Sequence, residues 1–189
     1  MQKKPKGKVR VIAGQWRGRL LTVPPVAAIR PTPDRVRETV FNWLQPFIAG
    51  ARVLDLYAGT GVLGIEALSR GARHATFIEQ NSLATRALNQ QLVIFEAQSR
   101  ACVHTASVLQ AGSLLEGHPY DVVFIDPPYD ARLLTATLSM LEATGSVHSR
   151  TLLYVEQRRK DPEEVPAGFG VYKHQAYGAV DYSLLQQVG

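Results

Sequence analysis

The 189-residue chain is predicted to be an α/β protein with a mostly parallel sheet of seven strands and helices on both faces. Three observations predict this fold. Strand and helix patterns alternate from residue 52 onward. The continuous apolar run Val122–Ile125 indicates a strand buried on both faces. A glycine-rich turn joins the first strand of the alternation to its helix, which is typical of parallel sheets that bind nucleotides.

The N-terminal part is predicted to form a small β-hairpin and one helix. Two short strands at 9–13 and 19–23 are separated by Gly14 and Gly18, and four prolines then predict an irregular connection. A helix begins near Thr32, the expected cap, with Asp34 near its positive dipole end. Its apolar stripe is Val36, Val40, Trp43, Leu44 and Phe47. Arg35 and Arg37 fall outside this stripe and are expected to face solvent or a ligand.

The remaining elements follow in alternation and end in a hairpin. Strands are predicted at 52–57, 74–79, 101–105, 120–126 and 151–156, and helices at 61–70, 82–97, 108–116 and 131–143. Two further strands, 169–175 and 179–187, indicate a C-terminal antiparallel hairpin with Gly178 near its turn. The mixed-charge segment 158–164 is interpreted as a solvated turn.

Length and composition indicate one cytoplasmic domain. A chain of this size buries enough surface to fold without metals or disulfides, and its single cysteine, Cys102, excludes an intrachain disulfide. No secretory signal is apparent, and the longest apolar run, 20–29, is too short to span a bilayer. The five histidines form no ligand pair at helical spacing, so we expect no metal site.

The positive charge lies almost entirely at the N-terminus. The net charge is +5, but the first 37 residues hold ten basic and one acidic residue, whereas the rest holds 11 basic and 15 acidic residues. We therefore expect a basic extension at 1–31, in contact with RNA, on an acidic domain at 32–189. A solubilising tail is the alternative for the first lysines, and a core position is the alternative for Trp16. The RNA-contact candidates are Arg10, Trp16, Arg17, Arg19, Arg30, Arg35 and Arg37.

The glycine-rich turn predicts a cofactor that contains a nucleoside. Gly59, Gly61 and Gly64 have the spacing that lets backbone approach a ligand, and Glu79 ends the next strand, where an acid can bind ribose hydroxyls. Asp55 would repel a pyrophosphate but suits the ammonium and sulfonium of S-adenosylmethionine. Alternatively, Asp55 caps amides of its own loop, and both roles are compatible. The cofactor-binding candidates are Asp55, Tyr57, Ala58, Gly59, Thr60, Gly61, Glu79, Gln80 and Ser107.

A second motif, Asp126-Pro127-Pro128-Tyr129, follows the strand predicted at 120–126. Two prolines fix the backbone and leave the Asp126 carboxylate and the Pro127 carbonyl as acceptors beside an aromatic ring. Such a set suits an exocyclic amine on a stacked nucleobase. An ordinary proline-rich turn with a surface tyrosine is the alternative. The catalytic candidates are Asp126, Pro127, Pro128 and Tyr129.

These segments resemble the class I, Rossmann-like S-adenosylmethionine-dependent methyltransferases of exocyclic amines, and more narrowly the bacterial RsmD-type enzymes. The resemblance is carried by RVIAGQWRGR (10–19), RPTPDRVRET (30–39), FNWL (41–44), DLYAGTG (55–61), EALSRG (66–71), DPPY (126–129) and YVE (154–156). It implies methyl transfer to N2 of a specific guanine in 16S ribosomal RNA of the small subunit, by an enzyme that we expect to be a monomer. The sequence departs from the family at Gln80 and at Ala106-Ser107, where related enzymes commonly have acidic or amide side chains.

Other functional classes remain open from the residues alone. The glycine spacing also fits a nicotinamide-dependent oxidoreductase, and the basic extension fits a non-catalytic RNA-binding module. Amine methyltransferases that act on DNA adenine or on a protein side chain share the four-residue motif. The oxidoreductase leaves residues 126–129 without a role, and the binding module leaves the glycine-rich turn without one.

Overall fold

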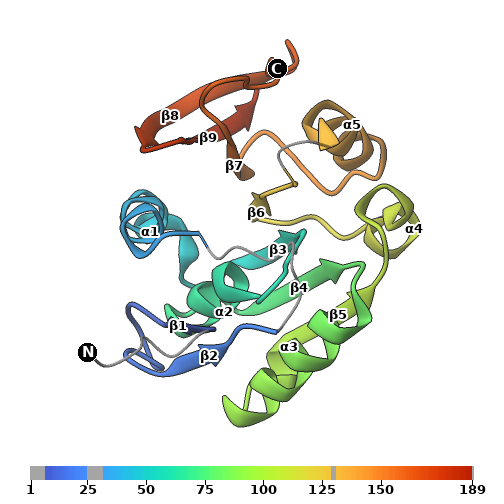
Figure 1. Ribbon diagram of the computed structural model, residues 1–189. Coiled ribbons are helices and arrows are strands. Elements are labelled where there is room, and N and C mark those ends of the chain that lie inside the picture. Colours follow the sequence, from blue (N-terminus) through green and yellow to red (C-terminus); the bar gives the residue numbers. More distant parts are fainter. Residues whose placement is uncertain (1–6, 25–31, 129–130, 189) are drawn as a thin grey trace.

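The computed structural model describes residues 7–24, 32–128 and 131–188 (Figure 1). The strands are β1 (Lys8–Arg10), β2 (Leu20–Thr22), β3 (Arg52–Leu56), β4 (His74–Glu79), β5 (Ala101–Thr105), β6 (Val122–Ile125), β7 (Leu152–Arg158), β8 (Phe169–Tyr177) and β9 (Val180–Gln187). The α-helices are α1 (Asp34–Ile48), α2 (Val62–Ser69), α3 (Ser82–Ile94), α4 (Gly112–Leu115) and α5 (Leu134–Ala143). Short 3₁₀ helices span Gln98–Arg100 and Val108–Gln110.

The main sheet has seven strands in the order β5-β4-β3-β6-β7-β9-β8. The first five strands of this order are parallel, whereas β9 runs antiparallel to β7 and to β8. The predicted fold class is therefore confirmed, including the C-terminal hairpin. From β3 the chain proceeds to β4 and β5, then returns to the other side of β3 with β6 and β7. This reversal between β3 and β6 is the point of a parallel sheet at which ligands bind.

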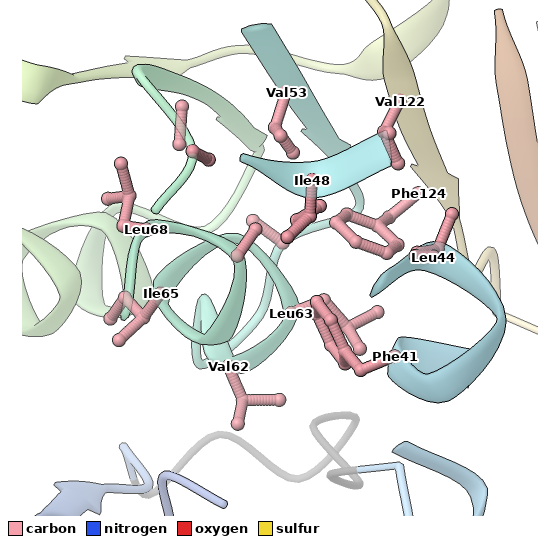
Figure 2. Close-up of a cluster of buried hydrophobic side chains, with 14 of the residues drawn as sticks. Phe41, Leu44, Ile48, Val53, Val62, Leu63, Ile65, Leu68, Val122 and Phe124 are labelled. Carbon is pink, nitrogen blue, oxygen red and sulfur yellow. The ribbon is translucent and has the colours of Figure 1, made fainter. Parts of the chain in front are cut away.

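Strand residues alternate between two hydrophobic clusters, one on each face of the sheet. Val53 and Phe124 belong to the cluster with α1, α2 and α3, whereas Leu54 and Ile125 belong to the cluster with α4 and α5. Figure 2 shows the first cluster, in which Phe41 of α1 and Leu63 of α2 point toward the sheet. Burial on both faces explains why the central strands are almost uninterrupted apolar runs.

The N-terminal hairpin, β1 with β2, is packed against α2 rather than extended from the domain. Both carboxylate oxygens of buried Glu66 accept backbone N–H groups, from Ile12 at 2.7 Å and from Ala13 at 3.0 Å. Ser69 Oγ accepts the Trp16 amide at 3.0 Å, and a Cβ on Gly14 would lie 1.9 Å from the Ser69 carbonyl oxygen. The hairpin is thus fixed to the helix by buried hydrogen bonds and by a contact that only glycine permits.

The first helix corrects two local predictions. It begins at Asp34 with Pro33 as its N-cap and no side-chain cap hydrogen bond, so Thr32 is not the cap. The predicted stripe is buried only in part: Phe47 is 44% exposed, whereas Phe41 and Ile48 are buried in its place. Proline fixes an extended backbone before the first turn, and this replaces the expected threonine cap. The helix predicted at 108–116 is a 3₁₀ turn followed by the single turn of α4.

Candidate active site

The loop between β3 and α2 is built around glycines with positive φ angles. Gly59 and Gly61 have φ angles of 54° and 72°, and Gly61 is the N-cap residue of α2. A Cβ on Gly61 would lie 2.3 Å from Leu88 Cδ1. On Gly64, a Cβ would lie 2.3 Å from Phe77 Cε1, so helix α2 can approach β4 only if this residue is glycine. The predicted glycine spacing therefore supports both the turn and the packing of the helix beneath it.

Two acidic side chains at the ends of β3 and β4 hold this loop. Buried Asp55 accepts the Gly64 amide at 2.9 Å, which confirms that it caps an amide of its own loop. Glu79 accepts the Gly59 amide at 2.9 Å with one carboxylate oxygen and the Asn81 amide at 2.7 Å with the other. Its position at the carboxyl end of β4 is the predicted one, and here the carboxylate fixes the loop beside which a nucleoside would bind.

The other cofactor-binding candidates lie at the same edge of the sheet. Tyr57 O–H shares a 2.6 Å hydrogen bond with Thr137 of α5, and Ala58 donates its amide to Ile78 at 3.0 Å. Thr60 is buried, Gln80 is exposed after β4, and Ser107 is half-buried after β5. The structure therefore brings the predicted set to the carboxyl ends of three neighbouring strands, with Gln80 after β4 and Ser107 after β5.

The segment 126–128 begins directly after β6, next to β3 at the chain reversal. Asp126 is half-buried, Pro127 is buried and Pro128 is exposed. Tyr129, the fourth catalytic candidate, lies outside the described residues. Ile125 pairs with Val155 in parallel register, so the next residue of β7, Glu156, follows the strand at the level of Asp126. Glu156 is buried and accepts the Tyr154 hydroxyl at 2.8 Å.

Burial, together with the negative charge gathered at this end of the sheet, perturbs the pKa values of two carboxyl groups. Desolvation by burial, opposed by the Gly64 amide and supported by the charge of Glu79, raises the pKa of Asp55 to about 8. Desolvation, with the charges of Glu156 and Asp55, raises the pKa of Asp126 well above its usual range. Glu156 was absent from the predicted site. Its sequence signal was an acidic residue at the end of an otherwise apolar strand, 152–155.

This set of acids fits a cationic cofactor better than an anionic one. A pyrophosphate at the start of α2 would meet the carboxylates of Asp55 and Glu79, which already accept the amides of the loop. An ammonium or sulfonium group would instead be stabilised by the same carboxylates and would lower their pKa values. The chemistry of these side chains therefore fits S-adenosylmethionine. Among the described residues, no group of three or more His, Cys, Asp or Glu side chains could hold a metal ion.

The predicted RNA contacts divide into exposed and buried residues. The side chains of Arg10, Arg17, Arg19 and Arg35 are exposed. Arg19 donates to the Ile94 carbonyl at 2.7 Å, with its guanidinium 4.4 Å from the centroid of the Phe95 ring. Arg30 lies outside the described residues.

Trp16 and Arg37 lie in the interior of the protein. Trp16 is 3% exposed and packs on Phe95 with ring centroids 5.0 Å apart, in agreement with the alternative of a core position. Arg37 is fully buried, contrary to the expected solvent-facing position, and its Nη2 donates to Asp34 at 2.6 Å and to the Arg10 carbonyl at 2.9 Å. Its Nη1 lies 3.7 Å from the Glu66 carboxylate. Both side chains hold the N-terminal hairpin in place and are not available to a nucleic acid in this structure.

Comparisons with known proteins agree on one family. The family described as conserved hypothetical protein 95 matches residues 9–186. The chain is 41% identical over 182 residues to ribosomal RNA small subunit methyltransferase D of Escherichia coli K12, covering 96% of this chain and 91% of that protein. It is 40% identical to the protein of the same name from Haemophilus influenzae, covering 96% and 95% of the two chains.

Solved structures give the same result. The structure of yhhF from Escherichia coli, described provisionally as a methyltransferase, superposes with a TM-score of 0.85 at 41% identity and covers 96% of this chain and 98% of its own. Within the described part of the chain, no helix is both long enough and apolar enough to cross a membrane.

Proposed function

The chain belongs to the family described as conserved hypothetical protein 95, that of the RsmD-type methyltransferases, and from this premise we propose that it methylates ribosomal RNA with S-adenosylmethionine. The finer proposal is transfer to the exocyclic N2 amine of one guanine of 16S ribosomal RNA, in the small subunit and by a monomer. The observation that carries it is the meeting of two motifs. Asp126 and Asp55 lie at the reversal point of the sheet, close enough for the charge of Asp55 to raise the Asp126 pKa.

The proposed chemistry follows from the acceptors after β6. The N2 amine of guanine is a weak nucleophile because its lone pair is delocalised into the ring. The Asp126 carboxylate and the Pro127 carbonyl would accept its two N–H bonds, which directs the lone pair away from the ring. When bound, S-adenosylmethionine supplies an electrophilic methyl group and leaves as S-adenosylhomocysteine. The raised pKa of Asp126 makes its carboxylate a better acceptor for the proton that the methylated amine releases.

The remaining residues have supporting roles in the proposal. Pro127 and Pro128 restrict the backbone that carries the acceptors, and Tyr129 would stack on the extruded base, worth about 1–3 kcal/mol. Asp55 and Glu79 would balance the positive charge of the cofactor and keep the glycine-rich loop in place. Arg10, Arg17, Arg19 and Arg35 would contact phosphates, and Arg30 stays a candidate outside the described residues.

The test is to map the modified nucleoside. Small subunits from a strain that lacks this gene would be incubated with the purified protein and isotopically labelled S-adenosylmethionine, then digested to nucleosides for mass spectrometry. We expect label in N2-methylguanosine at one position of 16S ribosomal RNA. Label in adenine or in a ribosomal protein would contradict the proposed substrate, while label in no product would contradict the activity.

A further inference from the structure

We propose that the turn after β7 and the tip of the β8–β9 hairpin form a second RNA-binding site, in which Arg159 and Lys160 hold the phosphates of nucleotides that flank the target base. This inference rests on the proposed function and adds to it a surface on the opposite side of residues 126–128 from the N-terminal hairpin. We call it the C-terminal basic site, and it is lined by Arg158, Arg159, Lys160, Gly178 and Ala179.

The C-terminal basic site is an open hollow with a fixed backbone. Its volume is about 530 Å³, and its walls come from two segments that are about 20 residues apart in the sequence. The Arg159 amide donates to the Ala179 carbonyl at 2.9 Å, which joins the turn to the tip of the hairpin. Gly178 has a φ angle of 60°, and a Cβ there would meet nothing within 4 Å. The two segments thus present a preformed concave surface that is open to solvent.

Positive and negative side chains of this turn are separated in space. Asp161 forms an ion pair with Arg132, and a Glu163 carboxylate oxygen accepts the Leu134 amide at 3.2 Å, so two of the three acids of the turn are directed toward the start of α5, while Glu164 is exposed. Arg159 and Lys160 are exposed and make no ion pair with any described residue. The interpretation of this segment as a solvated turn agrees with its exposure, and within the turn Arg159 and Lys160 lie at the hairpin side.

The register of the sheet places the C-terminal basic site beyond the candidate active site, in the direction in which β6 and β7 run. The last β6–β7 pair is Ile125 with Val155, but β7 continues for three residues to Arg158, which pairs with Val180. At about 3.3 Å per residue, β7 extends roughly 10 Å beyond the strand that carries Asp126. A second, smaller hollow is lined by Pro127, Pro128 and Arg158 among others. The segment 126–128 therefore lies beside the residue at which β7 ends and the turn begins.

The first turn of α1 links this surface to the N-terminal hairpin. The Arg35 guanidinium lies 5.2 Å from the ring centroid of Tyr177, at the tip of the β8–β9 hairpin. Two residues further along α1, buried Arg37 donates to the carbonyl of Arg10 in β1. Exposed cations therefore follow one another from Arg10 through Arg35 to Arg159 and Lys160. A strand of RNA whose target base enters at Asp126 would have cations on both sides, which is the arrangement that phosphate contacts need to fix its register.

The experiment compares two double variants that remove equal charge. Arg159→Gln/Lys160→Gln removes the two exposed cations of the C-terminal basic site. Arg73→Gln/Arg150→Gln, the matched control, removes two exposed cations that directly precede β4 and β7. They lie at the amino ends of these strands, opposite the end that carries the candidate active site. Binding of a protein-free single-stranded RNA that contains the target sequence would be measured by fluorescence anisotropy at several salt concentrations. Methylation of small subunits and calorimetric binding of S-adenosylmethionine would be measured in parallel.

We expect Arg159→Gln/Lys160→Gln to reduce the slope of log K against log salt by about 1.4, or about 0.7 for each lost contact with single-stranded RNA. The KM for the subunit should rise at least fivefold, while the control variant and cofactor binding stay unchanged. Equal slopes for the two double variants would overturn the inference. Weaker binding to subunits with unchanged binding to protein-free RNA would also overturn it, and would assign the surface to a ribosomal protein. If the wild type methylates no RNA, the proposed function itself has failed.

Discussion

Asp126 combines a position beside the chain reversal with an environment that disfavours its charged form. Replacement by asparagine keeps the size and one acceptor but removes the capacity to take up a proton. We expect Asp126→Asn to lower kcat by roughly 10²–10⁴ while S-adenosylmethionine binds as it does to the wild type. Single-turnover methylation and calorimetry measure these two quantities. A variant that methylates at the wild-type rate would exclude Asp126 as the proton acceptor.

Asp55 should make the stability of the cofactor-free protein depend on pH. Its pKa is about 8 in the folded protein and near 3.8 in the unfolded chain, so the folded state binds more protons between these values. Stability contributed by the protonated group is therefore complete below about pH 4 and decreases as the pH rises toward 8. Relative to the wild type, Asp55→Asn should gain up to about 4 kcal/mol of stability between pH 5 and pH 8, because each pH unit in this range is worth about 1.4 kcal/mol.

Urea unfolding at the two pH values tests this expectation. In Asp55→Asn a smaller decrease of stability with rising pH should remain, because the pKa of Asp126 is raised in the folded protein as well. A difference between variant and wild type that is the same at pH 5 and pH 8 would show that Asp55 does not titrate in this range.

At the scale of elements, Glu66 of α2 joins the N-terminal hairpin to α1. It accepts two amides of the hairpin and an Arg70 N–H at 2.7 Å, and it lies near the buried guanidinium of Arg37. Glu66→Ala would leave a buried cation and two amides without this carboxylate. We expect a loss of roughly 3–5 kcal/mol by urea unfolding, and faster cleavage by proteases between residues 11 and 24. Glu38→Ala, at an exposed position of α1, is the control and should change stability by less than about 0.5 kcal/mol.

The elements also show what the sequence could and could not predict. His74–Glu79 and Ala101–Thr105 have their predicted bounds, because both are short runs rich in apolar and β-branched residues between turn residues, although the second is a half-buried edge strand. The burial of Arg37 was not predictable locally. Asp34 is close in sequence, but the Arg10 carbonyl and Glu66 are 27 and 29 residues from Arg37, and a charged side chain next to an apolar stripe normally faces water. Similarly, Glu156 enters the site only through the pairing of β7 with β6, which no spacing along the chain reveals.

At the scale of the whole molecule, the identity of the cofactor is tested by its effect on unfolding. A ligand at 100 times its Kd stabilises the folded state by about 2.7 kcal/mol. We therefore expect S-adenosylmethionine to raise the Tm and NAD⁺ to leave it unchanged, because the acids around the glycine-rich loop disfavour a pyrophosphate. Differential scanning calorimetry with each ligand measures this. Stabilisation by NAD⁺ alone would favour the oxidoreductase interpretation of the same glycine spacing.

The docked N-terminal hairpin has a consequence for how RNA is bound. Its amides are already paired with Glu66 and Ser69, and Trp16 is already packed in the core. The exposed arginines of this hairpin therefore lie on a segment that is already ordered, so RNA binding involves no further loss of conformational entropy of the hairpin. Association should therefore resemble rigid docking rather than folding coupled to binding, with a small change in heat capacity.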